Sequence, residues 1–148
     1  MRLWDYRLIP VLPNKMLVSQ WRECIAIKRQ WEKGTLKHRL VSYVMNWQPS
    51  AFYYYSEKVV KEMNKRNIKY QQKFLDEIYN FCIVKGNAKF NFPEHNDRYL
   101  RECLYNLEEK AIRSIISKEE WEIIYNKFKD FTNLWNGKER DSNEMYGK

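Results

Sequence analysis

A single carboxylate, Glu23, follows Arg22 in a stretch of chain that otherwise carries positive charge. Lys15, Arg22 and Arg29 are seven residues apart, and on a helix this spacing places them in one basic stripe. A carboxylate beside such a stripe could act as an acid or base, or could stabilise positive charge that develops on a substrate. A solvated surface charge is the simpler interpretation, because most charged residues on helices face water.

The α-amine of Met1 is a second candidate for chemistry. An α-amine is a weaker base than a lysine side chain, so a larger share of it is unprotonated near neutral pH. The neutral amine is a competent nucleophile toward a sugar carbon that can become an imine. An ordinary frayed terminus is the alternative, and it is the usual state of the first residues of a domain.

Two further segments combine polar and aromatic side chains. Pro93-Glu94-His95-Asn96 precedes a stretch in which polar residues alternate with apolar ones, and by itself this predicts a capped amphipathic helix. The run from Phe52 to Tyr55 predicts a core face on one side and exposed tyrosine on the other. A base-stacking surface is the alternative for that run.

The chain has 148 residues with 27 Lys and Arg against 19 Asp and Glu, a net charge of +8. An excess of this size favours a polyanionic partner, and a basic protein without such a partner is the alternative. No apolar run is long enough to span a membrane, and the start of the chain lacks the apolar region of a signal peptide. We therefore expect a cytoplasmic protein with no membrane partner.

The cysteines and histidines do not indicate a metal site. Cys24, Cys82 and Cys103 are widely spaced, and His38 and His95 stand far apart in the sequence. Cys24 and Cys103 lie within apolar helical patterns, so we expect both to be small buried side chains.

Helical spacing of apolar residues, with only 4 Gly and 4 Pro, predicts an all-α fold in one compact domain over residues 1–137, followed by a polar tail at 138–148. We expect Pro10 and Pro13 to hold the first dozen residues extended. The first predicted helix begins at an Asn14 N-cap and ends at Gly34, and a short helical segment follows at 36–47. The next two run from a Ser50 N-cap to about Asn67 and over 74–82, where Gly86 ends the helix. The last two run from an Asn96 N-cap through Leu107, and from a Ser117–Glu120 capping box to Asn136-Gly137.

Taken together in their order, these features resemble the pyrimidine-dimer DNA glycosylases of the phage endonuclease V type. The resemblance runs from Met1 to about Phe128. It rests on these blocks: Met1-Arg2-Leu3, Leu17 followed by Gln20-Trp21-Arg22-Glu23, Phe52-Tyr53-Tyr54, Pro93-Glu94-His95, and Asn106-Leu107-Glu108-Glu109-Lys110.

The resemblance implies a compact helical protein that acts, mostly as a monomer and without metal or other cofactor, on duplex DNA containing ultraviolet pyrimidine dimers. In this family the N-terminal amine attacks C1′ of the damaged nucleotide, an imine forms and β-elimination cuts the strand. Glu23 stands at the place of the essential acid–base residue. Arg22 and Arg2 would hold phosphates, and Lys15 and Arg29 would extend the basic face.

The sequence also departs from the family pattern. The phage-type enzymes expose a small hydroxyl residue after removal of methionine, whereas Arg2 is too large for efficient trimming, so we expect Met1 to be retained as the nucleophile. Ala26 replaces a basic residue found after the family's glutamate, with Lys28 and Arg29 as substitutes. The family's aromatic, basic C-terminal segment is echoed only in Tyr146-Gly147-Lys148.

Two alternatives stay open at this point. The same amine and glutamate would suit a lyase or glycosylase that acts on abasic sites or oxidised pyrimidines. In a non-catalytic helical DNA-binding protein, Glu23 would be no more than a surface charge.

Overall fold

The computed structural model describes residues 1–83 and 86–129 of the chain. The regular elements in these ranges are all helical, which confirms the predicted all-α class. They are the 3₁₀ helix η1 (Tyr6–Val11), α1 (Asn14–Lys33), the 3₁₀ helix η2 (Ser42–Asn46), α2 (Pro49–Lys65), α3 (Gln72–Ile83), α4 (Asp97–Ile112) and α5 (Lys118–Phe128). The polar tail expected at 138–148, and the expected end of the last helix at 136–137, lie outside the described residues.

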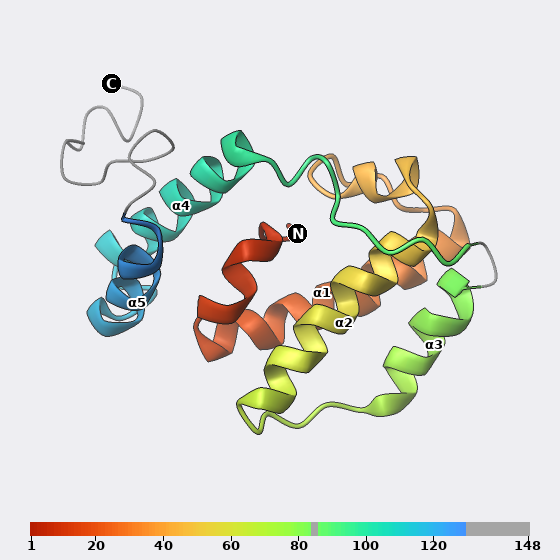
Figure 1. Cartoon of the computed structure of the whole chain (residues 1–148), viewed down its shortest axis with the longest axis horizontal. Coiled ribbons are helices and arrows are strands. Elements are labelled where there is room, and N and C mark those ends of the chain that lie inside the picture. Colours follow the sequence, from red (N-terminus) through yellow and green to blue (C-terminus); the bar gives the residue numbers. More distant parts are fainter. Residues whose placement is uncertain (84–85, 130–148) are drawn as a thin grey trace.

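Helix α2 is the centre of the packing (Figure 1). It contacts α1, α3, η1 and η2, while α5 contacts both α4 and η1. Figure 1 shows α4 and α5 as a pair at the opposite end of the molecule from α3, with η1 between this pair and α2. The N-terminal helix η1 therefore packs between α2 and α5, two helices that come much later in the sequence.

The core consists of the apolar faces that helical periodicity predicts. Leu17, Cys24 and Ile27 of α1 are fully buried, and α2 contributes Phe52 and Val59. Burial of such side chains stabilises the fold by roughly 1.5–3 kcal/mol each. Cys103 on α4 is also fully buried, so the prediction of small buried side chains at Cys24 and Cys103 is confirmed.

The first dozen residues are not extended, contrary to the expectation from Pro10 and Pro13. Residues 6–11 form η1 with Pro10 inside it, because the φ angle that proline fixes is close to that of a 3₁₀ helix. Asp5 caps η1 by accepting a hydrogen bond from the backbone of Arg7.

Two predicted N-caps are also wrong. Pro13 holds the cap position of α1, so Asn14 is already helical, and its side chain accepts a hydrogen bond from Arg66 at 3.0 Å. Pro49 is the first residue of α2, where its missing N–H costs nothing, and Gln48 takes the cap position. The Ser50 hydroxyl instead donates to the carbonyl of Ala88 at 2.5 Å.

Three other predicted helix ends are confirmed, whereas the helix expected over 36–47 is limited to η2 (Ser42–Asn46). Gly34 ends α1 in the left-handed region at φ 73°, where a side chain would be strained. The Asn96 side chain accepts from the backbone of Tyr99 at the start of α4. Ser117 and Glu120 form both hydrogen bonds of a capping box at the start of α5.

Candidate active site

Gln20 fastens the N-terminal segment to α1. Its side chain is 1% exposed and lies on the buried face of the helix. The amide nitrogen donates to the carbonyl of Arg2 at 2.9 Å, and the amide oxygen accepts from the backbone N–H of Trp4 at 2.8 Å. Residues 2–4 are therefore held alongside α1 by a side chain that pairs with a backbone carbonyl and a backbone N–H, as a neighbouring β-strand would.

Glu23 lies one turn further along α1, at the start of the same segment. Its Oε2 accepts from the backbone N–H of Arg2 at 3.2 Å and from the Gln20 amide at 3.1 Å. The α-amine of Met1 is three covalent bonds from that Arg2 nitrogen, so it lies no more than about 7 Å from the carboxylate. The fold thus brings together the two residues that the sequence suggested for catalysis, Met1 and Glu23.

Two tyrosines hold the other side of the segment. The hydroxyl of Tyr55 on α2 donates to the carbonyl of Trp4 at 2.6 Å, and that of Tyr99 on α4 donates to the carbonyl of Leu3 at 2.5 Å. Burial raises the pKa of both phenols well above the usual value, so both remain donors. Three helices therefore fix the backbone that leads to the amine.

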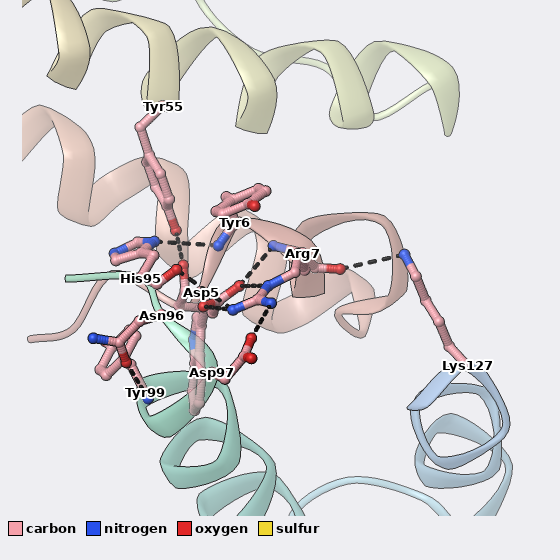
Figure 2. Close-up of polar contacts among 10 residues, drawn as sticks. Asp5, Tyr6, Arg7, Tyr55, His95, Asn96, Asp97, Tyr99 and Lys127 are labelled. Atoms are coloured by element: carbon pink, nitrogen blue, oxygen red, sulfur yellow. Dashed lines mark hydrogen bonds and ion pairs between the residues drawn. The ribbon is translucent and has the colours of Figure 1, made fainter. Parts of the chain in front are cut away.

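An ionic cluster secures the next residues of the segment (Figure 2). Asp5 is fully buried and accepts two hydrogen bonds from the Arg7 guanidinium, at 2.9 and 3.0 Å. Figure 2 shows the same guanidinium reaching Asp97 at the start of α4, at 2.9 Å. A buried carboxylate is tolerated here because each oxygen has a charged partner.

His95 lies beside this cluster and is 5% exposed. Burial, and secondarily the charge of Arg7, lowers the pKa of His95 to about 3, so the ring is neutral. Its Nδ1 accepts from the backbone N–H of Tyr6 at 3.2 Å, which leaves the ring proton on Nε2, 2.6 Å from the Tyr43 hydroxyl. His95 is therefore a neutral structural contact of the N-terminal segment.

The expected basic stripe is present on the exposed face of α1. Lys15, Arg22 and Arg29 are all exposed, and the first two line one hollow with Ser19. Arg29 lies over the ring of Phe74 at 5.2 Å. By the helical rotation of 100° per residue, this stripe begins about 80° around α1 from Glu23.

The remaining basic residues near the site are placed differently. Arg2 is half-buried, with its guanidinium over the rings of Trp4 at 5.6 Å and Tyr99 at 5.8 Å. Its Nη1 is buried without a hydrogen-bond partner in the described part of the chain. Lys28, considered as a substitute for the base missing at Ala26, is buried and paired with Glu32 at 2.9 Å, so it does not join the exposed stripe.

Sequence reasoning named Gln20 only as part of a motif and missed what it does. The available signal was a long amide at a helix position flanked by the core residues Leu17, Trp21 and Cys24. Such a residue must find hydrogen-bond partners inside the protein. Which partners it finds depends on how the N-terminal segment returns over α1, and the spacing carries no such information.

Residues 1–83 and 86–129 hold no group of three or more His, Cys, Asp or Glu side chains placed to bind a metal ion. None of the helices in those ranges combines the length and apolar character needed to cross a bilayer. Burial raises the pKa of the Cys24 thiol to about 12 and that of Cys103 to about 11.

The N-terminal half of the chain matches a family model. The model describes pyrimidine dimer DNA glycosylases and matches residues 1–76. The chain belongs to the pyrimidine dimer DNA glycosylase family. The match covers the N-terminal segment, α1 and α2, and so includes the Met1–Glu23 site and the basic stripe, whereas the resemblance was expected to extend to about Phe128. No curated protein and no solved structure matches this glycosylase.

Proposed function

We propose that this glycosylase removes ultraviolet pyrimidine dimers from duplex DNA through an imine on its N-terminal amine, and then cuts the strand as a lyase. One observation carries the proposal. Arg2 N–H and the Gln20 amide converge on the same oxygen of Glu23, which sets the carboxylate beside the start of the chain. Membership of the pyrimidine dimer glycosylase family supplies the substrate class.

The chemistry begins with the unprotonated α-amine of Met1. Its lone pair forms a bond to C1′ as the bond between C1′ and the base breaks, and the base leaves with that electron pair and takes up a proton. The nitrogen gives up a proton, and its lone pair then forms the C=N bond of the imine as the C1′–O4′ bond breaks and O4′ takes up a proton. Removal of a proton from C2′ then expels the 3′ phosphate, which cuts the strand.

Glu23 is proposed to serve two steps of this sequence. Its negative charge stabilises the positive charge that develops at C1′, and its carboxylate moves protons on the sugar. The two hydrogen bonds to Oε2 fix the carboxylate before substrate arrives, so little reorganisation is needed when charge develops. Exposed Arg22 is proposed to hold a phosphate, with Lys15 and Arg29 extending the contact along α1.

Arg2 is also proposed to hold a phosphate. Its guanidinium is half-buried against Trp4 and Tyr99, and it has one nitrogen without a hydrogen-bond partner in the described ranges. A phosphate that reached this nitrogen would supply the missing hydrogen-bond acceptor. The gain would be large, because a buried charged donor without an acceptor costs more free energy than a buried neutral donor without one.

Borohydride trapping on untagged protein tests the proposal. We expect a duplex carrying one thymine dimer to give a stable adduct on the N-terminal peptide, because borohydride reduces the imine carbon to a secondary amine. An adduct with an abasic duplex but none with the dimer would keep the lyase and exclude the dimer as substrate. Absence of both adducts, despite tight DNA binding, would point to a non-catalytic DNA-binding protein. Intact mass of the same protein shows whether Met1 is retained.

A further inference from the structure

A second basic surface lies away from the α1 stripe, between η1, α2 and α5. It is a groove of about 550 Å³ that we call the α2 groove. Its floor is apolar, formed by Ile9, Pro10 and Phe128, and its charged residues are Arg7, Lys58, Lys61, Glu62, Lys65 and Lys127. The reaction proposed above for Met1 and Glu23 uses none of these side chains.

Arg7 is paired with Asp5 and Asp97, but the four lysines of the α2 groove outnumber its one carboxylate. Its single carboxylate, Glu62, is engaged by Arg66 at 2.8 Å. Lys61 is 72% exposed and only loosely paired with Glu57, at 3.5 Å, while Lys65 is exposed. Such a surface attracts a polyanion, because each phosphate that replaces its counterions with lysine releases them to solution.

Two features show that the wall of the groove is held in place. Lys127 reaches from α5 to the backbone of Arg7 and donates to its carbonyl at 3.2 Å (Figure 2). Burial lowers the pKa of Lys127, and an anion bound beside it would raise that pKa again by favouring the charged form. On α2, Lys58 lies over the ring of Tyr54 at 4.1 Å, which fixes its direction.

The spacing of the lysines suits one DNA strand. Lys58, Lys61 and Lys65 follow each other at i, i+3 and i+7 along one face of α2. From the first to the last they span about 10 Å of helix, close to the axial rise of three phosphate-to-phosphate steps along one strand at about 3.4 Å each. The apolar floor beneath them suits the carbon-rich edge of the sugars.

We propose that the α2 groove binds the sugar-phosphate backbone of duplex DNA at a distance from the reacting nucleotide. Arg2 and Arg7 are five residues apart in one segment, so the reactive end and the groove lie within about 18 Å of each other. A duplex is therefore long enough to reach from one surface to the other. The proposal rests on the proposed function only in taking DNA as the partner and not in the imine chemistry.

The salt dependence of binding to an undamaged duplex tests the α2 groove without any catalysis. The test protein carries Lys58→Gln, Lys61→Gln and Lys65→Gln. The matched control carries Lys37→Gln, Lys89→Gln and Lys118→Gln, which remove the same charge from exposed sites elsewhere. We expect the slope of log affinity against log salt to fall by about 2–3 in the test protein, and affinity at 50 mM salt to fall at least about tenfold. The control slope should change by less than about 1.

Equal slopes in the test protein and the wild type would overturn the proposal, as would an equal loss in the control. If the triple substitution unfolds the chain, acetylation footprinting of the wild type gives the answer: DNA should protect Lys61 and Lys65 but not Lys37 and Lys89. Protection that rises with protein concentration alone would mean that a second copy of the chain occupies the groove. A reduced slope without any borohydride adduct would support DNA binding in the α2 groove and contradict the imine mechanism. An adduct with an unchanged slope would contradict only DNA binding in the groove.

Discussion

Replacement of Gln20 by methionine tests whether this side chain holds the reactive end of the chain in place. Methionine has a similar volume, so packing is largely kept while the hydrogen bonds are lost. The buried N–H of Trp4 and the part-buried carbonyl of Arg2 lose their partner, whereas the Trp4 carbonyl keeps Tyr55. At about 1–3 kcal/mol for each unpaired group, weighted toward the lower end because Arg2 is less buried, the free energy of unfolding should fall by about 2–4 kcal/mol.

Urea unfolding measures this loss directly, and the corresponding fall in Tm is about 6–12 °C for a chain of this size. Gln30→Met on the same helix is the matched control. Gln30 is only half-buried, so its replacement should change stability by less than about 0.5 kcal/mol. A Gln20→Met protein as stable as the control would refute the assignment of Gln20 as the anchor of the segment.

The same variant also separates positioning from stability. Gln20 donates to Glu23, and a displacement of about 1 Å at a reacting group costs on the order of 100-fold in rate. At a temperature where both proteins are fully folded, we expect borohydride trapping to be about 10- to 100-fold slower in Gln20→Met. Trapping at the wild-type rate in the folded variant would show that Gln20 stabilises the fold without orienting the chemistry.

Four more outcomes follow from the structure. Glu23→Gln should still bind a dimer-containing duplex but cut it at least about 100-fold more slowly, and cutting at the wild-type rate would remove Glu23 from the mechanism. Acetylation of the Met1 amine should abolish the trapped adduct while duplex binding persists, so an adduct on acetylated protein would place the nucleophile elsewhere. The unfolded chain protonates His95 near pH 6.5, whereas burial in the folded protein lowers its pKa to about 3, so this residue should reduce the free energy of unfolding by about 2 kcal/mol between pH 7 and pH 5. Urea titrations at both pH values should show this difference in the wild type and lose it in His95→Gln, and an unchanged pH dependence would contradict the assignment. Arg66→Met should destabilise the protein by about 2–3 kcal/mol, because the guanidinium donates to the carbonyls of three residues around η1, and its measured loss should exceed that of the exposed Arg113→Met.

The family could be identified from the sequence alone, because the motifs that indicate it are blocks of residues in a fixed order along the chain. Within the site, the exposed stripe of Lys15, Arg22 and Arg29 was also predictable, because helical periodicity alone fixes which side of α1 they share. The helix ends at Gly34, Asn96 and Ser117 were predictable for a similar reason, since capping is a contact between residues close in sequence.

The prolines show where local reasoning failed. Pro13 and Pro49 displaced the two hydroxyl and amide side chains that looked like caps, and Pro10 entered a helix instead of preventing one. In each case the freed side chain or backbone found a distant partner: Asn14 contacts Arg66, and Ser50 contacts Ala88. Sequence propensity depends only on residues that are close in the sequence, so it does not predict contacts between residues that are far apart in it.

The sequence by itself determined the α-helices of the described ranges, their buried faces and the family, because periodicity, capping and motif order are properties of short stretches of chain. The tertiary structure decided that the start of the chain lies against α1 between Tyr55 and Tyr99, with Gln20 and Glu23 at its first residues. It also decided that lysines of α2 and α5 share one groove with η1. Both arrangements depend on contacts between residues far apart in sequence, and only the packing of the whole core selects them.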